Sequence, residues 1–130
     1  MHFSEHELTA ALTGAAKSVV TAQRKDVRKG TVNIDTAWDE MDRFERFRLL
    51  DALGGQILPV LAALPEVEVA PGSRPSYPNR QVGEIVSGLV GDDLGRLQRA
   101  VTVRARTALV QTALANVPPR LDPEAFSEDA

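Results

Sequence analysis

The only two histidines of the sequence, His2 and His6, stand four residues apart at its start. On a helix, this spacing places two imidazole groups on one face, where they can bind a metal ion together with a carboxylate from Glu5 or Glu7. A stable site needs three or four fixed ligands, and this one would begin at a flexible terminus. The sequence has no cysteine to complete it. We therefore predict no metal site and no bound cofactor.

Carboxylates gather between residues 35 and 45, and paired carboxylates are common groups for general acid–base catalysis. Arginines alternate with them, several at i,i+4 spacing, which is typical of a solvent-exposed helix face with salt bridges. The sequence also lacks a glycine-rich phosphate loop, a Gly-x-Ser-x-Gly elbow and a cysteine nucleophile. We therefore predict no catalytic residues and no enzymatic activity. The acidic residues are Asp35, Asp39, Glu40, Asp42 and Glu45, and the arginines are Arg43, Arg46 and Arg48.

A dense group of basic side chains, Arg24, Lys25, Arg28 and Lys29, stands where we expect the first helix to end. Such a cluster can contact the phosphates of nucleic acid or of an anionic lipid. Cations are also favoured at a helix C-terminus, because they offset the helix dipole. Residues 1–117 carry equal numbers of basic and acidic side chains, whereas nucleic-acid-binding domains are usually basic. The helix-end interpretation is therefore the stronger one.

Residues 80–117 have helix–turn–helix spacing, in which Arg96 and Arg99 of the second helix would contact DNA. Asp92 and Asp93 argue against this interpretation, since they stand at the end of the helix that would enter the groove and would repel phosphate. A plain helical hairpin is the stronger interpretation. A nucleic-acid-associated regulator that uses the basic residues of the first and last helices is the alternative function.

Large apolar residues recur at every third position from Trp38 to Leu53. A helix turns every 3.6 residues, so this row drifts around the axis and favours steeply crossed packing over a parallel bundle. Because three of the six aromatic residues lie in it, we expect this helix to be the centre of the core. A small-molecule binder with a pocket near Trp38 is a further alternative function. The row is Trp38, Met41, Phe44, Phe47, Leu50 and Leu53.

Capping residues and helix breakers predict four main helices and one short helix. Ser4 and Glu7 form a capping box, the Gly54–Gly55 pair is expected to end a helix, and prolines exclude a helix at about 65–79. We predict an all-α fold, an irregular bundle with crossed packing, for a single domain at residues 1–117. A flexible acidic tail is expected at 118–130. The expected helices span residues 4–22, 35–53, 56–64, 80–90 and 93–117.

The last predicted helix carries apolar residues on two of its sides. We assign one stripe to the core. The second stripe exceeds what one core needs, and we predict that it contacts a partner. The core stripe is Leu94, Leu97, Val101, Ala105, Ala108 and Leu109, and the interface stripe is Val103, Val110, Leu114 and Val117.

The composition is that of a globular protein, with 43% hydrophobic and 25% charged residues among 130. No signal-peptide pattern starts the sequence, and no apolar stretch reaches the ~20 residues that span a bilayer. We expect a cytoplasmic protein without membrane insertion. The leading function is a non-enzymatic protein–protein interaction domain, either a homo-oligomer such as a homodimer or a subunit of a larger assembly.

Overall fold

The computed structural model describes residues 2–120, and within them all regular structure is helical. The all-α prediction is confirmed for these residues, whereas most of the predicted flexible tail, from residue 121 onward, lies outside them. In this part of the chain six helices pack against one another, instead of four main helices and a short one. They are α1 (Glu5–Gln23), α2 (Lys25–Arg28), α3 (Ile34–Glu40), α4 (Arg43–Ala63), α5 (Asn79–Leu89) and α6 (Arg96–Ala115).

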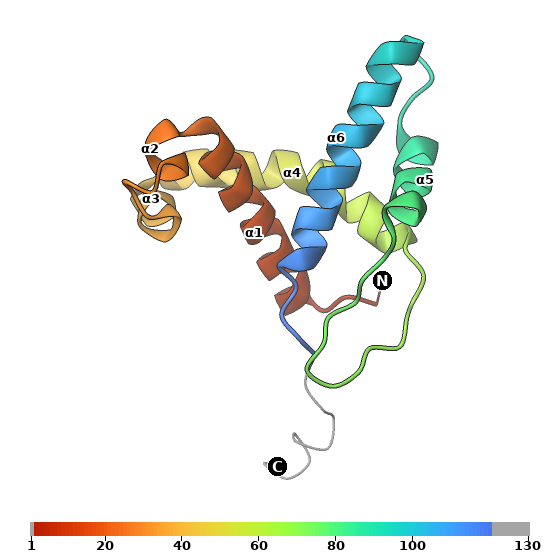
Figure 1. Cartoon of the computed structure of the whole chain (residues 1–130), viewed down its shortest axis with the longest axis horizontal. Coiled ribbons are helices and arrows are strands. Elements are labelled where there is room, and N and C mark those ends of the chain that lie inside the picture. The colour runs from red at the N-terminus through yellow and green to blue at the C-terminus, as the bar shows by residue number, and fades with distance from the viewer. Residues whose placement is uncertain (1, 121–130) are drawn as a thin grey trace.

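The three long helices cross one another, as Figure 1 shows. α4 lies across α1 and α6, and α5 packs beside α6. Small side chains allow the close approach of α1, since Ala11, Ala15 and Ala16 are completely buried. Larger core side chains come from the other long helices, among them Ile57 of α4 and Val110 of α6. The core therefore lies where α1, α4 and α6 cross.

The first helix begins as its capping residues predict. The Glu7 amide donates to Ser4 Oγ at 3.1 Å, and the Ser4 amide donates to Glu7 Oε1 at 3.0 Å, which completes the capping box. α1 ends at Gln23, and the single turn of α2 follows it. Gly30 then reverses the chain with a φ of 77°, a left-handed conformation that glycine adopts without strain.

The helix predicted at 35–53 is interrupted between Glu40 and Arg43, and it does not end before the Gly54–Gly55 pair as expected. Asn33 caps α3, which ends before Met41, and Asp42 Oδ1 then accepts from the Phe44 amide at 3.4 Å to cap a new helix. α4 continues through the Gly54–Gly55 pair, so the prediction that this pair ends a helix is wrong. Gly54 is buried beside α1. A Cβ atom at this position would make ordinary contacts with Leu12 and Leu58, so the glycine lies within the helix without ending it.

Burial of the two apolar sides of α6 is largely the reverse of the prediction, although Leu94 and Leu109 of the predicted core stripe do pack against the core. Val110, Leu114 and Val117 are at most 3% exposed and belong to the core of the chain itself. Leu97 and Val101, which we assigned to the core, are 80% and 61% exposed. The C-terminal half of α6 crosses α1 and α4, whereas its N-terminal half extends with α5 beyond them (Figure 1). The contacts of α1 and α4 with α6 therefore determine which side of α6 is buried.

The segment between α4 and α5, residues 64–78, contains no helix and is joined to the helices by hydrogen bonds. Tyr77 Oη donates to the Pro65 carbonyl at 2.7 Å, which closes the segment onto itself. Arg74 Nε donates to the Val117 carbonyl at 2.7 Å. These bonds place the segment against the end of α6.

Candidate interaction surfaces

One face of α4 exposes apolar side chains along most of the helix. Phe44 and Phe47, near its N-terminus, are each 64% exposed. Gly55, Pro59 and Ala62 are also exposed. All these positions fall on the side of the helix opposite to its buried residues, because each residue advances by about 100° around the axis. We call this surface the α4 face, and it comprises Phe44, Phe47, Arg48, Asp51, Gly55, Leu58, Pro59 and Ala62.

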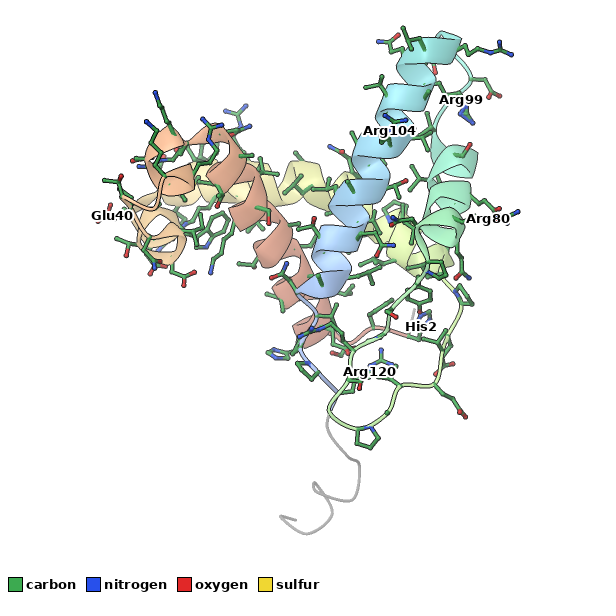
Figure 2. All side chains as sticks on the ribbon, in the orientation of Figure 1. His2, Glu40, Arg80, Arg99, Arg104 and Arg120 are labelled. Atoms are coloured by element: carbon green, nitrogen blue, oxygen red, sulfur yellow. The ribbon has the colours of Figure 1, made fainter. Side chains whose placement is uncertain are left out.

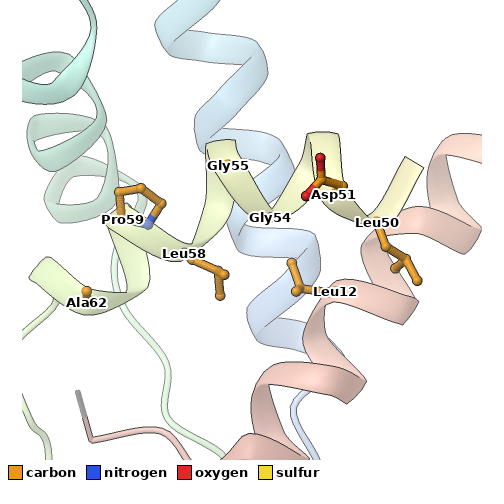
Figure 3. A pocket seen from close by; sticks show the side chains of 8 residues that line it. All are labelled: Leu12, Leu50, Asp51, Gly54, Gly55, Leu58, Pro59 and Ala62. Atoms are coloured by element: carbon orange, nitrogen blue, oxygen red, sulfur yellow. The ribbon is translucent and has the colours of Figure 1, made fainter. Parts of the chain in front are cut away.

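A shallow groove of about 680 Å³ runs along the C-terminal part of the α4 face, where it meets α1 (Figure 3). Leu12 of α1 lies near Gly54, and Leu50 and Leu58 lie on the same side of α4 (Figure 3). Asp51 is the only charged residue of the lining. The groove is therefore an apolar surface with a single carboxylate. Its lining is Leu12, Leu50, Asp51, Gly54, Gly55, Leu58, Pro59 and Ala62.

The two glycines create the hollow part of this groove. A Cβ atom at Gly55 would have no neighbouring heavy atom within 4 Å, so this position faces open space. A Cβ atom at Gly54 would lie 3.7 Å from Leu58 Cδ1 and 3.9 Å from Leu12 Cδ1. Phe44 stands eleven residues, about three turns, before Gly55 on the same side of the helix, and its exposed ring projects where the glycine has no side chain. The α4 face thus carries both a protruding ring and a recess.

Most of the residues predicted to form an interface on α6 have no free surface. Val110, Leu114 and Val117 are covered by other helices of the same chain, and Val103 is partly buried. Sequence reasoning missed the exposed rings of α4 because it placed Phe44 in the core. A sequence pattern could have indicated this exposed side of α4. Positions at three- and four-residue steps mark one side of a helix, and here they are 44, 47, 51, 55, 58 and 62.

The basic residues predicted to contact nucleic acid do not form one surface. Arg24 is paired with Asp26, at 2.8 Å between Nη2 and Oδ2. Lys25 and Arg28 are exposed on α2, and Lys29 follows it. α2 lies at the opposite end of the structure from the start of α6, where Arg96 and Arg99 stand (Figure 1).

The connection between α5 and α6 differs from a helix–turn–helix. α6 begins at Arg96 and not at Asp93, so residues 90–95 separate the two helices. This connection is longer than the usual turn of three or four residues. Arg96 and Arg99 are brought beside Ser87 of α5 instead.

Trp38 is 8% exposed and belongs to the core cluster. Its carbonyl accepts a hydrogen bond from Arg46 Nη1 at 3.2 Å, which links α3 to α4. Trp38 lines neither the groove on α4 nor the opening beside α5. Its burial counts against a ligand pocket built around the indole.

Within residues 2–120, no three histidine, aspartate or glutamate side chains converge on a point that could hold a metal ion. In the same part of the chain, none of the helices combines the length and hydropathy needed to cross a membrane. Comparison with protein-family models, curated proteins and solved structures finds none that matches this chain.

Proposed function

We propose that this chain is a self-associating helical interaction domain, and that the α4 face is the contact between two copies. The observation that carries the proposal is the pairing of protruding rings with a recess on one exposed helix face. Large exposed apolar surface on a soluble domain is typical of a protein-binding site. A face that carries both the protruding and the receding part is complementary to itself, as a two-fold contact requires.

The spacing along α4 supports an antiparallel pair. Phe47 and Gly55 are each four residues from Asp51, which is about 6 Å along the axis. Phe44 and Leu58 are each seven residues from Asp51, which is about 10.5 Å. A two-fold axis at Asp51 therefore places Phe47 of one copy at the axial level of Gly55 of the other, and Phe44 at the level of Leu58. Phe44 and Leu58 lie about 20° from the direction of Asp51 around the helix, whereas Phe47 and Gly55 lie about 40° from it, so the Phe44–Leu58 pairs face each other more directly.

The charges of the α4 face are complementary in the same arrangement. Asp51 lies at the two-fold axis, where two carboxylates approach each other. Arg48 precedes it by three residues, about 4.5 Å along the helix, which is within reach of the second copy's carboxylate. In the single chain the Arg48 guanidinium lies 5.8 Å over the Phe44 ring, on this same face. Two arginines thus offset two carboxylates at the centre of the contact.

The expected dimer is a weak one. Burying a phenylalanine side chain stabilises by about 1.5–3 kcal/mol. Four rings in the dimer contribute at most about 6–12 kcal/mol, against an association cost of about 4–15 kcal/mol. Because these ranges overlap, we expect a reversible monomer–dimer equilibrium that depends on protein concentration.

Sedimentation equilibrium of the full chain over a range of concentrations tests the proposal. The unmodified chain should associate reversibly to a dimer. Gly55→Gln should weaken association at least about tenfold, because the added side chain fills the recess, while the helix itself gains about 0.5–1 kcal/mol from the loss of a glycine. Gly88→Gln is the matched control, since Gly88 also faces open space in a helix but lies on α5. It should leave the dimer intact.

A second pair of variants separates the α4 face from the exposed side of α6. Phe47→Lys should give a monomer whose thermal unfolding is unchanged, because the ring is mostly exposed in the single chain. Leu97→Lys changes an even more exposed side chain of α6 and should still dimerise. A chain that stays monomeric at every concentration contradicts the proposal. So does a dimer that Leu97→Lys dissociates and Phe47→Lys does not.

A further inference from the structure

An opening of about 430 Å³ lies between α5 and the N-terminal half of α6. It is separate from the α4 face, which points away from α6. Half of its lining residues are arginines, and no carboxylate lines it. We call it the arginine cleft, and its lining is Ser87, Arg96, Arg99, Ala100, Val103 and Arg104.

Arg99 is fixed in the arginine cleft through one terminal nitrogen of its guanidinium, while the other terminal nitrogen is unused. Its Nη2 donates to the Ser87 carbonyl at 2.6 Å and to Ser87 Oγ at 3.2 Å. Its Nη1 is buried and has no hydrogen-bond partner among the described residues. Buried N–H groups are nearly always paired, so an unpaired one beside an opening points to an acceptor supplied from outside. Because two bonds already position the guanidinium, binding would cost little further ordering.

The carboxylates nearest to the cleft in the sequence, Asp92 and Asp93, precede α6 but do not line the cleft. None of the ion pairs among residues 2–120 involves Arg96, Arg99 or Arg104. Arg96 is the first residue of α6, so the positive end of the helix dipole adds to the three charges. Figure 2 shows Arg99 and Arg104 along α6, whereas Arg80 extends outward from α5.

We propose that the arginine cleft binds the phosphoryl group of a small phosphorylated molecule. Three guanidinium groups match a dianionic phosphoryl group better than a single carboxylate, and their planar donors pair with its oxygens. Ala100 and Val103 offer apolar contact to the rest of the molecule. The volume falls in the range of small-ligand sites.

A small ligand fits this arrangement better than a nucleic acid does. Duplex binding uses a basic surface that follows many phosphates. Here the three arginines line one cleft, and the other basic cluster, at residues 24–29, lies at the far end of the molecule (Figure 1).

Isothermal titration calorimetry with phenyl phosphate tests the proposal, with inorganic phosphate as a second probe and benzoate as a singly charged comparison. The full chain should bind phenyl phosphate most tightly and benzoate most weakly. Arg96→Gln and Arg104→Gln should each weaken phenyl phosphate binding about tenfold, because each removes a charge-assisted hydrogen bond. Both side chains are exposed, so these variants should fold normally. Arg99 is left unchanged because it also joins α5 to α6.

Arg80→Gln is the matched control. It removes the same charge from α5, outside the cleft, where Arg80 Nε lies 3.4 Å from Glu84 Oε1. It should leave phenyl phosphate affinity unchanged. An equal loss in Arg80→Gln and Arg104→Gln would show non-specific attraction and overturn the proposal. Salt-sensitive binding of a short DNA duplex by a chain that ignores phenyl phosphate would also overturn it, in favour of nucleic acid.

Discussion

The Glu7 carboxylate accepts a hydrogen bond from Arg120 Nε at 2.9 Å, although 113 residues separate the two in the sequence. The Glu7 side chain is 11% exposed and that of Arg120 is 27% exposed. Arg120 Nη2 also donates to the His2 carbonyl at 3.2 Å, and the guanidinium lies 5.8 Å over the Phe3 ring. This ion pair therefore joins the first turn of α1 to the segment that follows α6.

Acid should weaken this ion pair, because the pair needs the ionised Glu7 carboxylate. Burial raises the pKa of Glu7, but the hydrogen bonds from Arg120 and Ser4 outweigh burial and bring its pKa below the usual 4.5. Because the folded pKa lies below the unfolded one, the pair contributes its full stability above pH 4.5 and loses it as pH falls through the lowered pKa. Urea denaturation should show a free energy of unfolding that falls with pH in that window.

Glu7→Gln is the variant that isolates this effect. Glutamine can still accept from the Ser4 amide and keep the capping box, but it carries no charge for Arg120. We expect a loss of about 1–2 kcal/mol at neutral pH and a shallower fall in stability on acidification. Arg120→Gln should cost a similar amount, and the double variant should cost little more than either. A Glu7→Gln chain with the same acid dependence as the unmodified protein would contradict this account.

The local signal at the start of α1 was a better guide than the patterns used for the later helix limits and for the buried sides. The Ser4–Glu7 capping box depends on neighbouring residues only, and it is found in the structure. The Gly54–Gly55 pair has two interpretations, a helix end or a close approach of another helix. Only the position of Leu12 in α1 decides between them, and no local pattern contains it.

The buried side of α6 could not be read from α6 alone. Leu97 and Leu114 both belong to apolar stripes of similar strength, so hydropathy does not rank them. The choice depends on which side α1 and α4 cross, and that is a tertiary contact. The α4 face was missed for the related reason that an aromatic row was assumed to be core, although the break at Met41 separates Trp38 from Phe44.

The same substitution at two leucines of α6 should test this assignment of its sides. Leu114 is 3% exposed, so Leu114→Ala leaves a cavity in the core and should cost about 2–5 kcal/mol. Leu97 is 80% exposed, so Leu97→Ala should change stability by no more than about 0.5 kcal/mol. Chemical denaturation, monitored by the fluorescence of the single tryptophan, measures both changes in the free energy of unfolding. Equal losses would show that the two sides are assigned wrongly.

Two glycines inside long helices should respond oppositely to alanine. A methyl group on Gly14 would overlap the side chain of Asn116, which donates to the Thr112 carbonyl at 2.8 Å at the end of α6. Gly14→Ala should therefore destabilise by about 1–3 kcal/mol, the usual cost of overpacking. Gly55 faces open space, so Gly55→Ala should stabilise by about 0.5–1 kcal/mol.

Thermal unfolding midpoints of Gly14→Ala and Gly55→Ala, each compared with that of the unmodified chain, test this prediction. A second substitution, Asn116→Gly, removes the atoms that the new methyl group meets and should restore much of the stability that Gly14→Ala loses. If Gly14→Ala raised the midpoint as Gly55→Ala does, the close approach of α1 to α6 would be absent in solution.

Tyr77 is the single tyrosine of the chain, so its titration can be followed without interference. Burial raises the pKa of its phenol above the usual 10.0, and the nearby Glu66 carboxylate adds to this, while Arg120 opposes it. The phenol should titrate with a midpoint above pH 10.0 in the folded protein, seen by ultraviolet difference absorbance, and urea should return the midpoint to the ordinary value. Since the folded pKa is the higher one, this group stabilises below pH 10.0 and its contribution is lost as pH rises through the folded pKa.

Tyr77→Phe removes the bond to the Pro65 carbonyl and should cost about 0.5–1.5 kcal/mol, with faster amide exchange in residues 64–78. A phenol that titrates alike with and without urea would mean that this segment does not cover Tyr77 in solution.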